Sequence, residues 1–502
     1  MRDIILIMIS RYFQNLLNDK TASAIRKMFE EGKILKQKYG EENVYDFSLG
    51  NPDLDPPQKV LDAIKEVALE ERKGVHGYMS NAGYDEAREA MAKKESAQQK
   101  VSVDSSCVVM TVGAASAISA TIKALIMPGE EVIVPSPFFA EYTHYVHNHG
   151  GTLVPVSTKG DFSLDIDAIK SSLSPKTVAV IINSPNNPTG KIYTKGEIAS
   201  LCKALKDFGE KNSGLYPYLI CDEPYRDIVY DGLEVPPVFP EYPYSVIVTS
   251  FAKNLSIPGE RVGYICANPL NPEKSDFIAA ATMAFRISGC VNAPAFFQRV
   301  IAKSWDAQAD FSSYRRRRDL LMEVLDNAGL EYCKPQGAFY IFCKVPPQWN
   351  DDDSAFVDAL AEQHILCAPG AGFGKKGWFR IAYCVGEKTK FDLEEKNENS
   401  YGKFRGSALC EDRRLGGRCE RARNHAFEHG ARRENRDTEV LQNRPLAALA
   451  AARPYGSAGG SGGGLDGSLQ DYDSRLRQAR SLLHRPRRLL RTRRNLRRSR
   501  RN

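Results

Sequence analysis

The sequence predicts an α/β fold, in which a mostly parallel sheet with helices on both faces is followed by a smaller α+β domain. Short runs rich in β-branched residues alternate with helical segments up to about residue 291, an order typical of a parallel sheet. Polar residues directly follow three of these runs. Beyond residue 292, a long helical segment and two more strand-like runs replace the alternation. A chain of 502 residues is long enough for two or three domains.

Composition divides the chain into two parts of opposite charge. Hydrophobic residues make up 42% and charged residues 26%, as in an ordinary globular protein. The formal net charge is +7, but residues 401–502 hold 25 Lys and Arg against 10 Asp and Glu. Residues 1–400 hold the remaining 44 basic and 52 acidic groups. An acidic body therefore precedes an arginine-rich tail.

Several features favour a cytoplasmic protein that does not enter a membrane. No apolar run reaches the length of a membrane span. The opening ten residues, MRDIILIMIS, contain six consecutive apolar residues and no small-residue cleavage site, so we expect no secretory signal. They leave open whether Met1 or Met8 is the true start. The eleven cysteines form no CxxC pair, which favours reduced thiols.

The first part of the chain is predicted to be an arm that also contributes to the smaller domain, over residues 1–50. Residues 18–37 carry apolar side chains at helical spacing, and a short strand then runs into a turn at Gly50. Taken alone, that turn is an ordinary loop. A second turn, around Tyr78, leads into a helix over residues 85–98.

A strand over residues 107–111, a small-residue turn and a helix over residues 114–126 follow. A helix that begins directly after a strand presents free backbone N–H groups, which together with the helix dipole form an anion site. A tightly packed core helix would have the same composition. The next strand, over residues 131–134, is followed by Phe139, which by default belongs to the core.

The three strands with polar ends are predicted over residues 177–183, 218–221 and 245–249, with a helix over residues 195–211 between the first two. Because the carboxyl ends of parallel strands meet at one edge of a sheet, ligands bind there. The residues that follow these strands are SPNNPTG, DEPY and a stretch that contains Lys253. We expect this edge of the large domain, residues 51–291, to carry the active site.

The smaller domain is predicted over residues 292–389. It would contain a helix from residue 296 to 328, a helix over 356–363, and strands over 337–343 and 378–384. Residues 315–318 are four arginines in the first helix, which we interpret as a solvated face. Arg380 lies within an apolar strand without a local carboxylate, and a buried guanidinium is costly unless it meets an anion. A substrate carboxylate would be a suitable partner.

Lys253 lies in a bend rich in Ser, Gly and Pro, residues 250–264, SFAKNLSIPGERVGY. A lone lysine at a strand end is usually a surface group. Here Ser250 and Arg261 flank it, and a hydroxyl with a guanidinium suits one phosphate, while a nearby cation lowers the pKa of a lysine. The stretch resembles the lysine motif of class I aminotransferases, the aspartate aminotransferase-like group of fold-type I pyridoxal phosphate (PLP) enzymes. The resemblance extends from about Ser10 to about Lys388.

The resemblance implies a PLP-dependent transferase fold of type I and an enzyme of amino acid metabolism. Lys253 would carry the cofactor and move a proton, and Asp222 would hold the proton on the ring nitrogen. Tyr225 and Asn187 would hydrogen-bond the phenolic oxygen of the ring, and Phe139 would stack on the ring. The family's phosphate cup corresponds to Ala114, Ala115, Ser250 and Arg261. No metal site is implied.

The resemblance also implies substrate contacts and a homodimer. Gly50, Asn187 and Arg380 would bind the α-carboxylate of the amino acid. Tyr78 would cross to the cofactor phosphate of the neighbouring subunit. Arg286 matches, with an offset of one residue, an arginine that in some relatives reaches the neighbouring site, although a surface arginine is an equally good interpretation.

The function implied is transamination between an L-amino acid, aspartate or similar, and a 2-oxo acid such as 2-oxoglutarate. Some aspartate-selective relatives have a lysine where this chain has Ala115, so the amino donor stays open. A PLP-dependent β-eliminating lyase of the same fold shares Lys253, Asp222 and Arg380. An alternative from another class is a nucleic-acid-binding protein that acts through the basic tail, but the tail lacks interleaved aromatic residues.

The resemblance ends near Lys388, where the family continues into a closing amphipathic helix. Here only Phe391 and Leu393 offer apolar side chains before the composition changes to Arg, Ala and Gly. We predict an atypical tail over residues 390–502, disordered from about Glu394. Our hypothesis is that an out-of-frame translation replaced the native helix, and a genuine basic tail is the alternative. The other two reading frames of the gene would decide between them.

Overall fold

The computed structural model describes residues 9–18 and 24–385. The missing closing helix, the tail predicted to be disordered and the end of the resemblance near Lys388 concern residues outside the described ranges, as does the choice between Met1 and Met8. Within the described part of the chain, no helix is long and apolar enough to cross a membrane.

The larger sheet has seven strands in the order β2-β8-β7-β6-β5-β3-β4. Neighbouring strands are parallel except for β8, which runs antiparallel to both β2 and β7. The predicted mostly parallel sheet is therefore confirmed. Its strands are β2 (Val108–Thr111), β3 (Glu131–Ser136), β4 (Thr152–Ser157), β5 (Thr177–Asn183), β6 (Tyr218–Asp222), β7 (Ser245–Ser250) and β8 (Gly263–Ala267).

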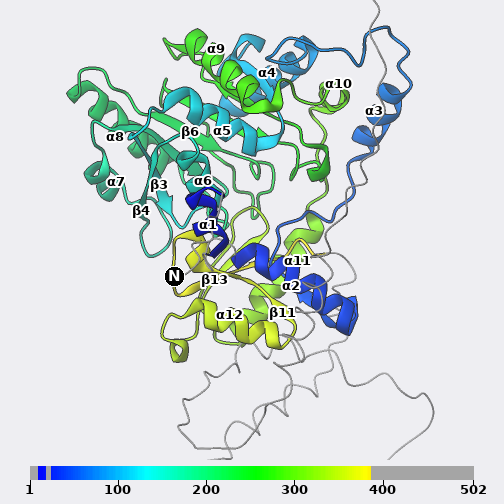
Figure 1. Cartoon of the computed structure of the whole chain (residues 1–502), viewed down its shortest axis with the longest axis vertical. Coiled ribbons are helices and arrows are strands. Elements are labelled where there is room, and N and C mark those ends of the chain that lie inside the picture. Colours follow the sequence, from blue (N-terminus) through cyan, green and yellow to red (C-terminus); the bar gives the residue numbers. More distant parts are fainter. Residues whose placement is uncertain (1–8, 19–23, 386–502) are drawn as a thin grey trace, which may run out of the picture. The chain divides into compact units, whose positions relative to one another are not determined.

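Helices cover both faces of this sheet (Figure 1). Alternate residues of β5 point to opposite faces, so Val180 and Ile182 join one core cluster and Ala179 and Ile181 the other. Residues of these helices complete the first cluster: α3 (Gln58–Ala68), α4 (Asp85–Gln99), α7 (Ile166–Ser172), α8 (Lys195–Lys211) and α10 (Ala295–Ser304). The second cluster contains residues of α5 (Gly113–Leu125), α6 (Glu141–His147) and α9 (Lys274–Phe285).

A second core forms around a four-stranded sheet of order β12-β13-β10-β9 and a two-stranded parallel sheet of β1 and β11. The strands are β1 (Tyr45–Asp46), β9 (Tyr332–Cys333), β10 (Tyr340–Lys344), β11 (Ile365–Leu366), β12 (Ala368–Pro369) and β13 (Trp378–Ala382). The helices that pack into this core are α2 (Ala24–Tyr39), α11 (Ser312–Asn327) and α12 (Asp353–Glu362). Because β1 pairs with β11, the segment before residue 50 contributes a strand to this second core.

The N-terminal helix α1 (Arg11–Asn18) lies beside α6 (Figure 1). The hydroxyl of Tyr12 is 2.9 Å from Nδ1 of His144, and its ring stacks on His147 at 4.1 Å. The helix predicted over residues 18–37 instead begins at Ala24, and residues 19–23 lie outside the described ranges.

The single helix predicted over residues 296–328 is wrong. The chain forms α10 and α11, separated by residues 305–311. Val300 and Ile301 of α10 are buried in the larger core, whereas Tyr314 and Leu321 of α11 are buried in the smaller core. The two apolar stripes face different cores, so the chain turns between them. α10 therefore packs with the larger part although it follows the boundary predicted at residue 292.

The interpretation of the four arginines as a solvated face is correct only for Arg315 and Arg316, which are exposed. Arg317 forms an ion pair with Asp53 at 2.8 Å. Arg318 is 3% exposed, bonds Asp231 at 2.9 Å and stacks over the ring of Tyr230. Four consecutive arginines show no apolar periodicity, so the sequence does not reveal which of them faces a partner from another element.

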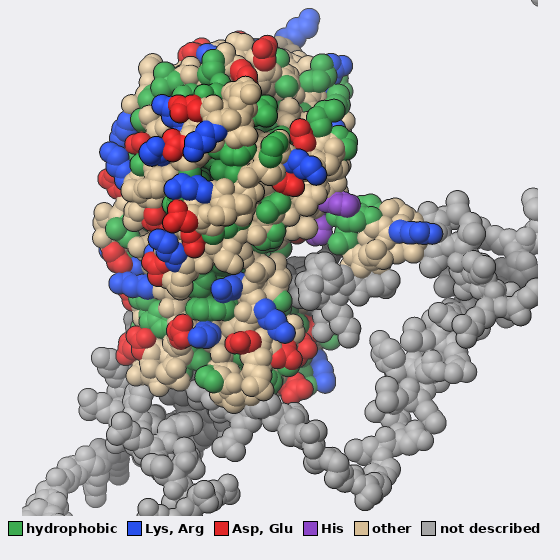
Figure 2. All heavy atoms as spheres, turned by 90° about the vertical axis from the view of Figure 1, so that its left-hand side faces the viewer, with side chains coloured by type: hydrophobic (Ala, Val, Ile, Leu, Met, Phe, Trp, Pro, Cys, Tyr) green, Lys and Arg blue, Asp and Glu red, His purple; other side chains and the backbone are tan. Residues whose placement is uncertain are grey.

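Acidic and basic side chains of the described residues are interspersed over the face drawn in Figure 2. A protein that binds nucleic acid through its folded body would instead gather basic side chains on one face. This face offers no such patch.

Candidate active site

Lys253 follows β7, at the carboxyl edge of the larger sheet. Its Nζ atom donates a hydrogen bond to the carbonyl oxygen of Gly50 at 2.7 Å and lies 5.6 Å from the ring centre of Phe339. Burial lowers the pKa of Lys253 to about 8, and the positive charges of Arg380 and Arg261 act in the same direction, although the Cys384 thiol opposes them. The amine is therefore neutral far more often than a surface lysine.

Asp222 ends β6, next to the strand that leads to Lys253. It is 4% exposed, and its Oδ2 accepts a hydrogen bond of 2.5 Å from the hydroxyl of Tyr142. Its Oδ1 is buried and has no hydrogen-bond partner among the described residues. Burial raises the pKa of Asp222 to about 7, and the bond from Tyr142 partly offsets that effect. This carboxylate lacks a partner for one oxygen.

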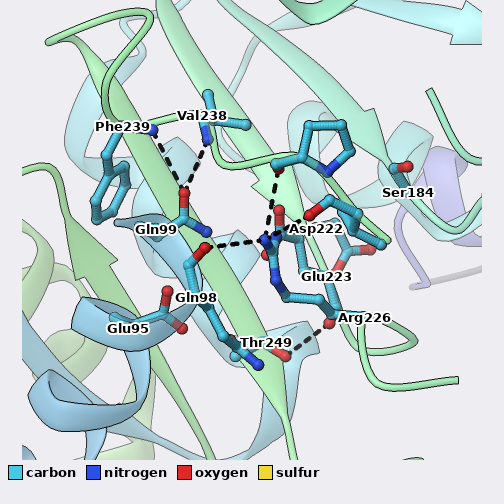
Figure 3. A network of polar contacts seen from close by, with 12 residues as sticks. Glu95, Gln98, Gln99, Ser184, Asp222, Glu223, Arg226, Val238, Phe239 and Thr249 are labelled. Carbon is cyan, nitrogen blue, oxygen red and sulfur yellow. Dashed lines mark hydrogen bonds and ion pairs between the residues drawn. The ribbon is translucent and has the colours of Figure 1, made fainter. Parts of the chain in front are cut away.

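A polar network lies behind Asp222, on the side of α4 (Figure 3). Arg226 forms an ion pair of 2.7 Å with Glu223 and donates a hydrogen bond of 2.9 Å to the carbonyl oxygen of Val235. The hydroxyl of Thr249, on β7, donates to the carbonyl oxygen of Glu223. Burial raises the pKa of Glu223 to about 7, against the effect of Arg226. The bond from Thr249 joins the end of β7, which leads to Lys253, to the residue that follows Asp222.

The predicted anion site lies at the start of α5. Gly113, the first residue of the helix, has a φ of 76°, which favours glycine. A Cβ atom built there would lie 3.0 Å from Nη2 of Arg261, so that guanidinium rests against the first turn. Ala114 and Ala115 are half-buried in this turn, where backbone N–H groups have no helical partner. Ser250 pairs with Gly263, two residues after Arg261.

Arg380, in β13, is 4% exposed, and among the described residues it pairs with no carboxylate. Its Nη1 donates to Oδ1 of Asn187 at 3.1 Å, and its Nη2 donates to the carbonyl oxygen of Ser48 at 2.5 Å. Its Nε is buried and has no hydrogen-bond partner in this part of the chain. The guanidinium lies between the rings of Tyr340 and Phe373, at 4.6 and 4.8 Å from their centres. A bound carboxylate would neutralise this charge and satisfy Nε.

Gly50 and Tyr225 both meet the hydroxyl of Tyr340. A Cβ atom on Gly50 would lie 2.0 Å from that hydroxyl oxygen, so only glycine fits here. The hydroxyls of Tyr225 and Tyr340 are 2.9 Å apart. Within the described chain the group that approaches Gly50 is therefore a tyrosine, and its predicted contact with a substrate carboxylate stays a prediction.

The other predicted residues lie further from these contacts. Phe139 is half-buried, with its ring edge-on to that of Tyr142. Tyr78 is 94% exposed, and Arg286 is exposed at the start of η4 (Arg286–Cys290). The side chains of Tyr78 and Arg286 form no hydrogen bond or ion pair with other described residues. Their predicted roles, which require a second subunit, stay predictions.

Sequence reasoning missed three aromatic residues, Tyr142, Tyr340 and Phe373. Tyr142 lies in the first turn of α6, three residues after Phe139, and the two rings meet edge-on. Tyr340 lay inside a predicted strand, where an aromatic residue is read as core. Nothing local in the sequence links either residue to its partner, because Tyr142 is 80 residues from Asp222 and Tyr340 is 115 residues from Tyr225.

These residues fit PLP. The unpartnered Oδ1 of Asp222 is a suitable partner for a protonated ring nitrogen, and the first turn of α5 with Arg261 is suited to a phosphate. In the strand order of the larger sheet, β7, which leads to Lys253, lies between β2, which leads to α5, and β6, which ends at Asp222. The pKa of Lys253 is also lowered. This combination of fold and site defines a PLP-dependent enzyme of fold type I.

Comparisons with known proteins define the class more closely. The family model for aminotransferase class I and II matches residues 42–392. The aspartate/prephenate aminotransferase of Thermus thermophilus is 32% identical over 348 residues, which cover 68% of this chain and 86% of the relative. The aromatic-amino-acid aminotransferase 2 of Thermococcus litoralis is 31% identical, covering 72% and 91%. An aminotransferase structure from Eubacterium rectale has a TM-score of 0.72 and 38% identity, covering 76% and 96%.

The chain belongs to the class I and II aminotransferases. It is a PLP-dependent transaminase of the aspartate aminotransferase-like group, as its lysine motif predicted.

Proposed function

We propose that this enzyme exchanges the amino group of aspartate or a similar L-amino acid with a 2-oxo acid such as 2-oxoglutarate. The observation that carries the proposal is Arg380, a buried guanidinium whose Nε has no partner in the described chain. A carboxylate beside it is common to both substrates. The names of the relatives, which include aspartate, prephenate and aromatic amino acids, support this range of substrates.

The residues around Asp222 would hold the cofactor. When bound, PLP supplies an electron sink that stabilises negative charge at the Cα of the amino acid. Asp222 would keep a proton on the ring nitrogen, with its carboxylate oriented by the hydrogen bond from Tyr142. Tyr225 and Asn187 would hydrogen-bond the phenolic oxygen of the ring, and Phe139 would stack on the ring. Ala114, Ala115, Ser250 and Arg261 would bind the phosphate.

Lys253 holds the cofactor and then acts as the base. Its buried amine, with a pKa of about 8, is neutral in about a tenth of molecules at pH 7, far more often than an ordinary lysine. In its neutral form this amine would act as the general base toward the Cα proton of the amino acid. Arg380 and Asn187, joined by a hydrogen bond of 3.1 Å, orient the amino acid by its α-carboxylate during that transfer.

The test is a panel of amino donors with 2-oxoglutarate, followed by glutamate formation. We expect aspartate to be among the best donors and Lys253→Ala to be inactive. Borohydride reduction of the loaded enzyme should attach the cofactor to Lys253, as read by peptide mass spectrometry. Undiminished transamination by Lys253→Ala would refute the site. Pyruvate formed without any acceptor would instead indicate the β-eliminating lyase.

Arg286 is proposed to recognise the side-chain carboxylate of a dicarboxylic substrate bound in the neighbouring subunit. Ala115 offers no cation for that carboxylate, whereas Arg286 is exposed and unpaired in the described chain. Arg286→Ala should then raise KM for aspartate at least tenfold more than KM for alanine. Equal effects on the two donors would remove this assignment.

We also propose that the enzyme is a homodimer in the cytoplasm, from the exposure of Tyr78 and the state of the cysteines. Tyr78, a large aromatic residue that is 94% exposed, is suited to reach a neighbour's cofactor phosphate. All nine cysteines of the described chain are free thiols, as expected in a reducing compartment. Mixing inactive Lys253→Ala with impaired Tyr78→Ala subunits should restore about a quarter of the activity, because one site of each hybrid dimer is complete. No recovery in the mixture would contradict the shared site.

A further inference from the structure

We propose that Tyr340 is a positioning residue with two separable roles: its ring orients Arg380, and its hydroxyl orients the hydroxyl of Tyr225. The proposal rests on the proposed function of the site, because it concerns the residues that would bind substrate and cofactor. It adds a direct link between the carboxylate site and the group that contacts the cofactor oxygen.

The register of the smaller sheet places Tyr340 on the same face as Arg380. In the antiparallel pair of β10 and β13, Phe342 lies opposite Arg380, and Tyr340 lies opposite Ala382. Because alternate residues share a face, Tyr340 is a diagonal neighbour of Arg380, a distance that an aromatic side chain can span. The ring centre of Tyr340 accordingly lies 4.6 Å from the guanidinium carbon.

The ring of Tyr340 forms one wall of the arginine site and Phe373 forms the other, at 4.8 Å. The two rings limit rotation of the guanidinium about its long axis, and each contributes a cation–π contact. The hydrogen bonds to Asn187 and Ser48 fix its two Nη atoms in the remaining directions. Removing either ring should therefore loosen Arg380 without removing its charge.

The hydroxyl of Tyr340 lies beside Tyr225 and Gly50, which are proposed to contact the cofactor and the substrate. It lies 2.9 Å from the hydroxyl of Tyr225, and it occupies the space that a Cβ on Gly50 would need. Gly50 in turn accepts the hydrogen bond from Lys253. Tyr340 is 2% exposed, so this hydroxyl competes little with water.

Proton counting gives the bond a direction. Each phenol has one proton to donate, and burial keeps both groups protonated, raising the pKa of Tyr340 to about 12 and that of Tyr225 well above its usual value. If Tyr225 donates its proton to the cofactor oxygen, its own oxygen is left to accept. Tyr340 is then the donor of the 2.9 Å bond. Loss of the Tyr340 hydroxyl would free Tyr225 to rotate.

The test uses two substitutions that separate the roles. Tyr340→Phe keeps the ring and removes the hydroxyl, whereas Phe373→Leu removes the other ring and leaves the hydroxyl in place. Tyr340→Leu removes both. The control is Tyr242→Phe, which also deletes a buried hydroxyl, one that donates to the carbonyl oxygen of Pro217 at 2.8 Å. All four are compared with the parent enzyme loaded with PLP.

Two measurements besides activity are informative. Calorimetric titration with maleate, an unreactive dicarboxylate, measures binding at Arg380. We expect the affinity for maleate to fall about fivefold to tenfold in Phe373→Leu and Tyr340→Leu, because each loses a cation–π contact. In Tyr340→Phe the affinity should change less than about twofold, because the ring remains. The absorbance of bound PLP against pH reports the cofactor oxygen. Its midpoint should move by about half a unit or more in Tyr340→Phe and Tyr340→Leu, and stay unchanged in Phe373→Leu and Tyr242→Phe.

An unshifted midpoint in Tyr340→Phe would overturn the role of the hydroxyl, and undiminished maleate binding in Phe373→Leu and Tyr340→Leu would overturn the role of the rings. If Tyr340→Leu does not fold, the two single-role variants still decide both points. If the parent enzyme does not transaminate the proposed substrates, the donor panel shows it. That result is separate, because it does not change the maleate affinities or the absorbance midpoints of the variants relative to the parent.

Discussion

At the scale of single residues, burial shifts the pKa values of the two central groups in opposite directions. It raises the pKa of Asp222 and lowers that of Lys253, because in both cases the low-dielectric surroundings disfavour the charged form. Without the cofactor, both groups are therefore closer to neutral than they would be in water. A cofactor with a cationic ring nitrogen and an aldehyde matches the carboxylate and the neutral amine respectively.

The first prediction concerns Asp222 and the pH dependence of stability. In the unfolded chain its carboxyl loses a proton near its ordinary value of 3.8, whereas in the PLP-free fold it holds the proton up to about pH 7. The folded state therefore binds more protons in that window, and stability falls as pH rises through it. Asp222→Asn should avoid this loss and be about 2–4 kcal/mol more stable than the parent at pH 8, with little difference at pH 4.

Thermal melts of PLP-free protein across pH 4–8 would measure this difference. Glu223, whose pKa is raised mainly by burial, is present in both proteins, and the charge of Asp222 adds to its shift, so the difference between the two proteins includes this coupling. In the PLP-loaded proteins the order should reverse, because the ionised carboxylate then has a cation to pair with. A parent protein that melts at the same temperature as the variant at every pH would contradict the raised pKa.

At the scale of elements, α11 shows how one helix divides its arginines between solvent and core. Residues 315 and 316 face solvent, while Arg317 and Arg318 bind carboxylates from other segments, Asp53 and Asp231. Arg318 also stacks over Tyr230 at 4.5 Å, which brings the loop after β6 against this helix. The helix thus links the smaller core to a segment that begins at Asp222.

The second prediction compares two neighbouring arginines of this helix. Arg318→Met should lower the free energy of unfolding by about 2 kcal/mol, because it removes a buried guanidinium that binds two carboxylates. The loss is limited to that size because both carboxylates are half exposed and can be hydrated. Arg316→Met changes the same residue type at an exposed position and should stay within about 0.5 kcal/mol of the parent. Urea denaturation of the PLP-loaded enzyme measures both. Equal losses in the two variants would show that the buried pairs contribute nothing.

At the scale of the whole molecule, the aminotransferase part and the basic tail are separable in sequence. The family model ends at residue 392, and every residue assigned to the site lies before it. The 25 Lys and Arg of residues 401–502 therefore add charge without adding any predicted site residue. Whether they are an evolved module or an out-of-frame translation is decided by the gene, as set out above.

The third prediction is that a chain of residues 1–390 keeps kcat and KM for aspartate within about twofold of the full chain. Retention of the full chain, but not of this shorter chain, on immobilised DNA at low salt would support the nucleic-acid-binding alternative, because phosphate contacts by arginines are strongly salt-dependent. Steady-state kinetics and a salt gradient on the column measure the two effects. Loss of activity together with the tail would show that the tail supports the fold.

The mostly parallel sheet, most of its strands and the central residues of the site could be predicted from the sequence. β5, α8 and the ends of β6 and β7 follow from local patterns: the alternation of apolar residues, small-residue turns, and polar residues placed just after a strand. Arg380 stands out as a guanidinium inside an apolar strand, and Lys253 as a cation in a bend between Ser250 and Arg261, whereas the role of Asp222 was implied by the family resemblance.

Only the tertiary structure decided which residues meet across large separations in the chain. Tyr142 bonds Asp222, and Tyr340 contacts both Tyr225 and Arg380. The helix α10 packs into the larger core, whereas α11, which follows it, packs into the smaller core. In sequence these residues are ordinary aromatic or helical positions, because periodicity reports which face of an element is buried but not what it is buried against. Arg380 and Asn187, 193 residues apart, become neighbours only when the smaller sheet folds beside the larger one. That packing depends on the combined shape of both cores, which no local pattern in the sequence encodes.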